Sequence, residues 1–241
     1  MCHASRRGSP CRLSPCSISG SRTLPLLHKR EGTAEELHHT VLPIERGVWL
    51  LTPARPAIVL GSSQKDEDID HAFCAANGID VVRRRSGGGA VYVHPTESLW
   101  IDIVLPRGDA LWNDDIGKSM WWIGEWWASL LADVGAASTE VHRGAFERNE
   151  WSDLVCLAGR GSGEVFANGQ DAQRKIVGIS QRRTRDYARF QCIAYFQWDA
   201  ALHASMLPGL QNDVSRIAEL AAPVPVGLLH RVITPTLPHH P

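Results

Sequence analysis

Three stretches of the sequence hold residues whose types and spacing could do chemistry. The first, "RRRSGGGAVYV" (83–93), places arginines and a serine before three glycines, and an apolar alternating run follows. Because glycine lacks a Cβ atom, a ligand can lie against such a backbone and accept hydrogen bonds from its N–H groups. Arginines beside it could neutralise a phosphate or a carboxylate. The stretch therefore predicts an anion-binding surface, with a tight turn and solvent-facing arginines as the alternative.

The glycines do not match the common nucleotide-binding loops. A Walker loop or a Rossmann turn needs GxxxxGK[ST] or GxGxxG at the start of a helix. Here "AVYV" reads as a strand directly after Gly89. Phosphate binding at a helix N-terminus is therefore not supported.

The second stretch, "RKIVGIS" (174–180), reads as a strand with a lysine inside it. Strict alternation places Lys175, Val177 and Ile179 on one face of that strand. A lysine at a strand edge that extends its amine to water is the alternative. Together with the glycine stretch, we interpret Lys175 as a fixed cation aimed at negative charge on an acyl or phosphoryl group.

The third stretch, "WSDLVCLAG" (151–159), holds Cys156 upstream of Lys175. A thiolate beside an ammonium group would be nucleophilic. A buried cysteine that packs as a small hydrophobic residue is the alternative, and it is the more frequent case.

Elements of both types must position these stretches. Apolar runs and alternation predict strands at 57–61, 79–83, 90–93, 98–106, 154–159, 164–170, 174–180 and 189–198, with a hairpin turn at Asn168-Gly169. Helical spacing predicts helices at 64–78, 113–134, 200–207 and 213–221. Helices set among hairpin-connected strands indicate an α+β fold around a mixed, largely antiparallel sheet with packed helices.

Two of these elements carry clear face assignments. In strand 98–106, one face holds Leu99, Ile101, Ile103 and Leu105, and the other holds Trp100, Asp102 and Val104. In helix 113–134, one stripe holds Trp122, Trp126, Leu130 and Val134. We expect this helix to pack against the sheet rather than to form a stacking platform.

Composition at the two ends sets the expected limits of the fold. Residues 1–35 are rich in Ser, Arg and Pro, and we expect a disordered segment or an over-long predicted start, although the composition resembles a transit peptide. Residues 36–220 form the expected catalytic domain. Residues 221–241 carry five prolines and predict a tail without regular structure.

Global composition narrows the class of protein. The chain is 44% hydrophobic with a formal charge of −1, which gives no basic surplus for nucleic acid. No apolar run reaches the ~18 residues that span a bilayer, so no membrane association is expected. The six cysteines show no CxxC spacing, and no HExxH motif occurs. We expect a cytoplasmic protein without a structural metal.

The motifs "VVRRRSGGGAVYV" and "RKIVGISQRR", in this order, resemble the catalytic domain of the lipoate-protein ligase A family. The resemblance covers about residues 45–205, and it implies a biotin/lipoate ligase-like fold. It also implies catalysis by Lys175. The family's substrate- and adenylate-binding positions fall on Arg83, Arg84, Ser86, Gly87, Gly88, Gly89, Ala90, Val91 and Gly178.

The resemblance further implies an activity and its partners. Lipoate or octanoate would react with ATP to give an acyl-adenylate, with Mg²⁺ screening the leaving pyrophosphate. The acyl group would pass to a lysine on a lipoyl domain of a 2-oxoacid dehydrogenase E2 subunit or on the glycine cleavage H protein.

Two other functions remain open on the same scaffold. In the octanoyltransferase branch that resembles this family, an octanoyl group from acyl carrier protein would pass through a Cys156 thioester. A non-catalytic lipoyl-binding protein is the other alternative. Finally, a basic cluster could dock an acidic acceptor or carrier domain, or could form an ordinary solvated edge; its members are Arg182, Arg183, Arg185 and Arg189.

Overall fold

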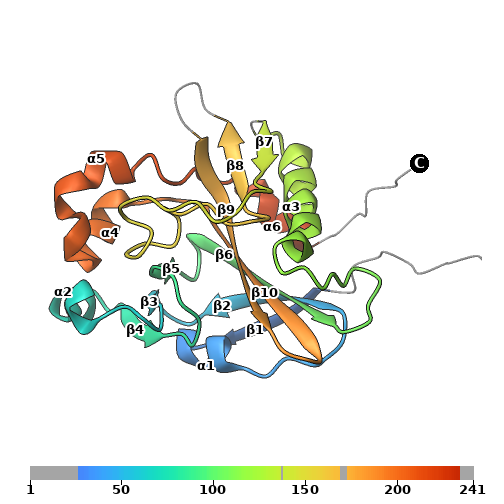
Figure 1. The fold of residues 1–241 in the computed structure, drawn as a ribbon. Helices are drawn as coiled ribbons and strands as arrows, with labels where there is room; N and C mark the ends of the chain where they lie inside the picture. The colour runs from blue at the N-terminus through green and yellow to red at the C-terminus, as the bar shows by residue number, and fades with distance from the viewer. Residues whose placement is uncertain (1–26, 137, 169–172, 234–241) are drawn as a thin grey trace, which may run out of the picture.

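The chain folds around two β-sheets that pack face to face (Figure 1). A computed structural model describes residues 27–136, 138–168 and 173–233. Seven strands form the large sheet in the order β1-β2-β6-β10-β9-β8-β7, and three form the small sheet in the order β4-β3-β5. The predicted α+β fold with a mixed, largely antiparallel sheet is confirmed.

The large sheet contains one parallel pairing, between β1 and β2, and its other pairings are antiparallel. Its strands are β1 (Leu27–Gly32), β2 (Gly47–Pro53), β6 (Ser98–Pro106), β10 (Tyr187–Tyr195), β9 (Gln173–Arg183), β8 (Val165–Asn168) and β7 (Thr139–Val141). In the small sheet, β3 (Ala57–Leu60) pairs in parallel with β4 (Asp80–Arg83) and antiparallel with β5 (Val91–Val93).

Helices cover both faces of the large sheet (Figure 1). The α-helices are α1 (Ala34–His39), α2 (His71–Ala76), α3 (Trp121–Asp133), α4 (Ala200–Met206), α5 (Val214–Ile217) and α6 (Gly227–Ile233). Short 3-10 turns lie at η1 (Asp66–Asp68), η2 (Lys118–Met120) and η3 (Pro208–Asp213). Helices α3 and α6 pack on one face, and the small sheet packs on the other with α1, α2, α4 and α5.

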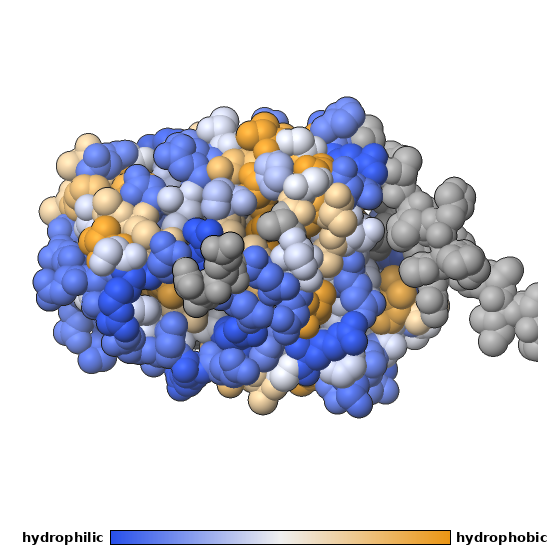
Figure 2. All heavy atoms as spheres, turned by 90° about the horizontal axis from the view of Figure 1, so that it is seen from above, coloured by the Kyte–Doolittle hydropathy of each residue, from blue (hydrophilic) through white to orange (hydrophobic). Residues whose placement is uncertain are grey.

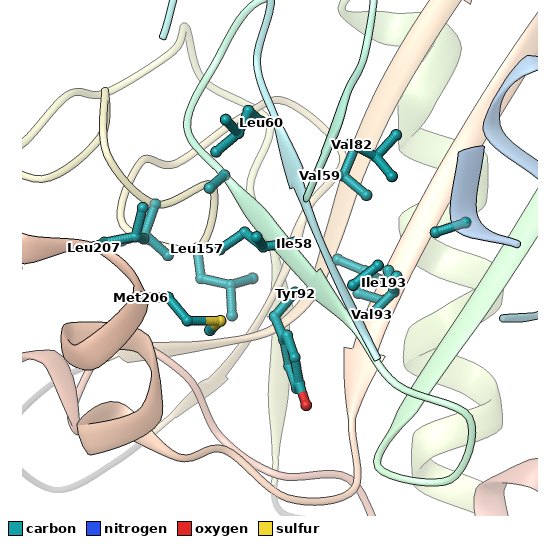
Figure 3. Close-up of a cluster of buried hydrophobic side chains, with 14 of the residues drawn as sticks. Ile58, Val59, Leu60, Val82, Tyr92, Val93, Leu157, Ile193, Met206 and Leu207 are labelled. Carbon is teal, nitrogen blue, oxygen red and sulfur yellow. The ribbon is translucent and has the colours of Figure 1, made fainter. Parts of the chain in front are cut away.

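Strand β6 separates the two resulting cores as its alternation predicts. Leu99, Ile101, Ile103 and Leu105 join the core beneath α3, and Trp100 and Val104 join the core beneath the small sheet. Figure 3 shows part of this second core, where Ile58 and Leu60 point away from the side on which Val59 lies. The face assignment made from the sequence is therefore confirmed.

Helix α3 begins later than predicted, because polar side chains hold the preceding segment in turns. The N–H groups of Leu111, Asp115 and Lys118 donate to the side chains of Asp109, Asn113 and Asp115 respectively. Such local bonds compete with helix formation. The buried stripe also differs, since it consists of Ile123, Gly124, Trp127, Leu130 and Leu131, while Trp122 and Trp126 are only partly buried.

The fold extends beyond both predicted limits. Strand β1 and α1 begin before residue 36, and α6 lies in the segment that was expected to lack regular structure. Leu228 and Val232 of α6 are buried against the α3 core, and the Val224 N–H donates to the Tyr195 carbonyl. Pro223 and Pro225 precede α6 and do not prevent the burial of this segment. The rest of segment 1–35, and residues 234–241, lie outside the described residues.

The segment 154–159 is also not a strand. It forms turns, with a single bridge between Ala90 and Val155, and it packs between the glycine stretch and β9. The predicted Asn168-Gly169 turn falls partly on residues outside the described ranges. On the face seen in Figure 2, hydrophilic residues predominate and the apolar areas are small and separate.

Candidate active site

The glycine stretch is shaped mainly by the protein's own backbone. A Cβ atom on Gly89 would lie 2.5 Å from the Val155 nitrogen, and Gly88 has a φ of +92°. A Cβ atom on Gly61 would lie 1.9 Å from the Gly88 carbonyl oxygen. Within this stretch, a Cβ atom on Gly87 would meet nothing within 4 Å. Chain packing therefore requires Gly89, the positive φ favours glycine at position 88, and Gly87 has open space beside it.

The two family arginines bind backbone carbonyls. The buried Arg84 guanidinium donates to the carbonyls of Val59, Gly87 and Gly89, at distances between 2.7 and 3.3 Å. Arg83 donates to the carbonyls of Gly61 and Gln64 and pairs with the Asp66 carboxylate. These guanidinium groups hold the glycine stretch and the 61–66 loop in place, and Arg84 also lines the apolar cavity described below. Their role in binding the adenylate stays a prediction.

The next residues of the motif face three environments. Ser86 lines a polar pocket, and its carbonyl accepts from the Ser62 N–H. Ala90 is buried and pairs through its N–H with the Leu154 carbonyl and through its carbonyl with the Cys156 N–H. Val91 lines an apolar cavity. The motif therefore connects two cavities to the 154–156 segment.

Lys175 is almost completely buried, with 1% of its surface exposed. Its Nζ lies 2.7 Å from Oε2 of Glu164 and donates to the Cys156 carbonyl over 3.0 Å. Its backbone pairs with Ala221 and Phe166 on either side. The alternative of a lysine extending into water is therefore excluded.

A β-bulge in β9 explains which face Lys175 occupies. Val177 pairs with Val165 and Lys175 pairs with Phe166, so β9 has one more residue than β8 at this point. Ile176, Val177 and Ile179 pack in the α3 core. The Lys175 amine lies on the opposite side, with Cys156. Strict alternation was therefore wrong here, because the extra residue reverses the face between Lys175 and Val177.

Cys156 is partly exposed and lines the apolar cavity. Its N–H donates to the Ala90 carbonyl, and its carbonyl accepts from Lys175. Lys175 itself is absent from the residues that line the cavity. The cysteine thus stands between the lysine and the cavity.

The apolar cavity lies between the two sheets. Figure 3 shows three of its lining side chains, Val59, Val93 and Ile193, at the border of the hydrophobic cluster. The full lining is His38, Val59, Arg84, Val91, Val93, Trp100, Cys156, Gly178, Ile179, Ser180, Gln191, Cys192 and Ile193. A Cβ atom on Gly178 would lie 3.2 Å from Ile193, so the glycine allows close packing at this wall. The mostly apolar lining suits an apolar group.

A polar pocket adjoins this cavity. It is lined by His38, His39, Arg85, Ser86, Gln181, Arg182, Arg189 and Gln191, and it shares His38 and Gln191 with the apolar cavity. Three arginines make it cationic. Burial and the nearby arginines Arg189, Arg84 and Arg182, together with His39, lower the pKa of His38 to about 4. His38 is therefore neutral near pH 7, and its Nδ1 lies 3.2 Å from Nε2 of Gln191.

The basic cluster predicted for docking divides into buried and exposed members. Arg189 is buried, bonds to the Asp102 carboxylate over 2.5 Å, and donates to the carbonyls of Leu37, His38 and Thr40 at the end of α1. Arg183 stacks on Trp112 and donates to backbone carbonyls. Arg182 and Arg185 are exposed. Arg189 is thus corrected from a surface group to a structural one.

Sequence reasoning missed Glu164, His38 and Gln191. Glu164 lies in the turn before β8, and no motif marks it. His38 comes from a segment close to the expected start of the domain, and Gln191 sits in an apolar strand. Gln191 could have been found, because a polar residue within an otherwise apolar strand indicates a polar contact or a site.

In residues 27–136, 138–168 and 173–233, no three His, Cys, Asp or Glu side chains are grouped as metal ligands. Across those same ranges, no helix has the length and apolar character needed to cross a bilayer.

An apolar cavity between two sheets, an adjoining cationic pocket and a buried lysine make up the candidate site of this α+β domain. Comparison with known proteins identifies its family. A model of the lipoyl protein ligase A/B catalytic domain matches residues 32–239. The chain belongs to this family.

Individual relatives agree with that assignment. Lipoate–protein ligase 1 from Staphylococcus aureus (strain Mu50) is 46% identical over 79 residues, which cover 32% of this chain and 21% of that protein. The match therefore spans about a fifth of the relative's length.

Solved structures share the fold at low sequence identity. A putative lipoate protein ligase from T. acidophilum with bound lipoic acid has a TM-score of 0.59 at 16% identity, over 86% of this chain and 80% of that one. Lipoate-protein ligase A bound with ATP has a TM-score of 0.58 at 16% identity, over 88% and 83%. A bipartite ligase structure with its E2 lipoyl domain, from Thermoplasma acidophilum, has a TM-score of 0.59 at 15% identity, over 86% and 81%.

Proposed function

We propose that this protein is a lipoate-protein ligase that activates lipoate or octanoate with ATP and transfers the acyl group to a lysine of a lipoyl domain. The observation that carries the proposal is the apolar cavity joined to a cationic pocket through His38 and Gln191. A fatty acyl chain fits the first, and a phosphate attached to its carboxyl end fits the second. The similar structures that hold lipoic acid and ATP support this arrangement.

The reaction consists of two displacements. In the first, the lipoate carboxylate attacks the α-phosphorus of ATP, the P–O bond to pyrophosphate breaks, and lipoyl-AMP forms. In the second, the amine of the acceptor lysine attacks the acyl carbonyl, and AMP leaves as the carbon–oxygen bond breaks. Both steps place negative charge where the acyl carbonyl meets the phosphate.

Lys175 provides a fixed positive charge for these steps. Its amine contacts the carbonyl of Cys156, whose residue lines the cavity, so the charge lies directly behind the cavity wall. Because the surroundings are buried, this charge acts with little screening by water. The described residues hold no cluster of metal ligands. We therefore expect Mg²⁺ to arrive on the nucleotide phosphates, and we assign no step to it.

The first test is lipoate-dependent exchange of labelled pyrophosphate into ATP. The wild type should catalyse exchange, and Lys175→Met should lose it at least about 100-fold, in line with the loss of one preorganised charge. The control is Lys118→Met, since Lys118 is exposed near an acidic side chain on the surface. Exchange that survives in Lys175→Met refutes the proposed role of this lysine.

The acceptor is proposed to be a lipoyl domain, either of a 2-oxoacid dehydrogenase E2 subunit or of the H protein. The bipartite ligase structure with its E2 lipoyl domain supports the first choice. Incubation with each acceptor and lipoyl-AMP, followed by mass spectrometry, distinguishes them. We place the reaction in the cytoplasm, because Cys74, Cys156 and Cys192 are free thiols that suit a reducing compartment.

A second function is favoured by one specific observation, the position of Cys156 in the cavity wall. In that reaction the Cys156 thiolate attacks an octanoyl thioester on acyl carrier protein, and the carrier thiol leaves. The acceptor amine then displaces the cysteine. Octanoyl transfer that disappears in Cys156→Ser, in an enzyme without pyrophosphate exchange, would establish this function. Full transfer by Cys156→Ser excludes it.

A further inference from the structure

Glu164 is a buried carboxylate that the proposed reaction does not yet use. It lies in the segment between β7 and β8 with 3% of its surface exposed. Buried acids are rare unless they are paired, because an isolated charge is strongly disfavoured away from water. Its partners therefore indicate its role.

Three groups donate to the Glu164 carboxylate. Oε2 accepts from the Lys175 amine over 2.7 Å and from the Gly161 N–H over 2.5 Å. Oε1 accepts from the Ile179 N–H over 3.2 Å. The two backbone donors come from the turn before β8 and from β9, so they fix the carboxylate between these elements. A carboxylate held on two sides can in turn fix the amine.

The Lys175 amine would have several alternative positions without this partner, because its chain carries four rotatable bonds. The structure places it between Glu164 and the Cys156 carbonyl, and these contacts direct it to the back of the cavity wall. Neither Glu164 nor Lys175 is among the residues that line the apolar cavity. Loss of Glu164 should therefore disturb the charge and leave the acyl-binding surface intact.

We propose that Glu164 is the positioning residue of this active site: it holds the Lys175 ammonium group against the Cys156 carbonyl. The inference rests on the proposed function, because it assigns Glu164 a part in the reaction that Lys175 serves. A purely structural role for the ion pair is the competing explanation.

The kinetic test compares Glu164→Gln with the wild type. We expect kcat to fall by about tenfold or more while the KM for lipoate changes less than about threefold, because the cavity is not touched. An unchanged kcat overturns the proposal.

Glu147→Gln is the matched control. Glu147 lies in the same segment and also pairs with a basic side chain, Arg160 at 3.2 Å, but it is exposed. This variant should keep the wild-type kcat and KM. A control that lowers kcat as far as Glu164→Gln would show that the segment, not the buried carboxylate, is responsible, and the proposal would fail.

A second measurement keeps the proposal testable if Glu164→Gln folds poorly. If Glu164 acts through Lys175, the double variant Glu164→Gln with Lys175→Met should be as active as Lys175→Met alone. It should also be more stable to urea than Glu164→Gln, because no unpaired buried charge remains. A double variant with lower activity and lower stability than either single variant indicates an independent structural role and refutes the proposal.

A third measurement does not depend on activity. The chain has four lysines, Lys29, Lys65, Lys118 and Lys175, so the Nζ resonance of Lys175 can be assigned by its loss in Lys175→Met. We expect a sharp, slowly exchanging ammonium signal that disappears in Glu164→Gln and persists in Glu147→Gln. A signal unaffected by Glu164→Gln overturns the inference. If the ammonium signal behaves as expected in both variants but the wild type shows no pyrophosphate exchange, the ligase chemistry is refuted and the positioning role of Glu164 is not.

Discussion

Replacement of Gly89 by alanine tests whether the glycine stretch is required by the protein's own backbone. A Cβ atom at this position would lie 2.5 Å from the Val155 nitrogen, 2.6 Å from the Val155 carbonyl carbon and 2.8 Å from the Leu154 carbonyl carbon. All three are main-chain atoms, so no side-chain rotation can relieve the overlap. The 154–156 segment must move away from the glycine stretch.

The expected cost follows from these contacts. Overpacking of a rigid site costs about 1–3 kcal/mol. Movement of the segment also weakens two hydrogen bonds, from Ala90 N–H to Leu154 and from Cys156 N–H to Ala90, at 2.8 and 3.0 Å. Each contributes about 1 kcal/mol, and the smaller freedom of alanine in the unfolded chain returns about 0.4–1 kcal/mol. We therefore expect the free energy of unfolding to fall by about 2–4 kcal/mol.

Urea unfolding followed by far-ultraviolet circular dichroism measures this change. Gly87→Ala is the control, because its Cβ atom would meet nothing within 4 Å and its φ is not positive. The control should raise the free energy of unfolding by about 0.4–1 kcal/mol, because alanine restricts the unfolded chain and meets no neighbour here. Equal unfolding midpoints for the two variants would refute the argument that chain packing requires Gly89.

Three further predictions concern the buried charges and the cavity. Arg189→Met should lower the free energy of unfolding by about 3–5 kcal/mol in urea titrations, because it leaves the buried Asp102 carboxylate unpaired; a loss below 1 kcal/mol contradicts this. Burial lowers the pKa of His203 from 6.5 to about 4, so its contribution to stability is complete above pH 6.5 and is lost as the pH falls through 4. The free energy of unfolding of the wild type should fall between pH 7 and pH 4.5, and that fall should be smaller in His203→Phe by on the order of 2 kcal/mol. The same fall in both proteins argues against this prediction. Val91→Phe should fill the cavity and weaken lipoate binding by about tenfold or more in calorimetry without lowering stability, and wild-type affinity would show that the acyl chain lies elsewhere.

The parts of the fold with regular periodicity could be predicted from the sequence. Strand β6 has the predicted limits and faces, because its alternation reflects two separate cores. The 154–159 segment has the apolar composition of a strand, yet it folds into turns. Its backbone makes only two hydrogen bonds to Ala90 at the end of the glycine stretch. The bulge in β9 leaves no compositional mark, so the face of Lys175 could not be read from alternation.

The candidate site was predictable in its motifs and less so in its contacts. The motif residues do gather around two adjoining pockets and the buried lysine. The sequence does not show that Arg84 and Arg189 also donate to backbone carbonyls of the protein itself, because those carbonyls belong to segments distant in sequence or to irregular backbone. Glu164 lies in an irregular turn, where neither periodicity nor spacing relates it to Lys175.

The segment between β7 and β8 has a consequence for chimeric proteins. It contacts the glycine stretch through Leu154 to Cys156 and contacts β9 through Glu164 and the Cys156 carbonyl, so both motifs share it as a common wall. A graft that exchanges either motif with one from a relative leaves foreign backbone against this wall. A unit that keeps these contacts therefore includes residues 83–93, 142–164 and 173–183 together with residues 57–66, whose carbonyls bind Arg83 and Arg84.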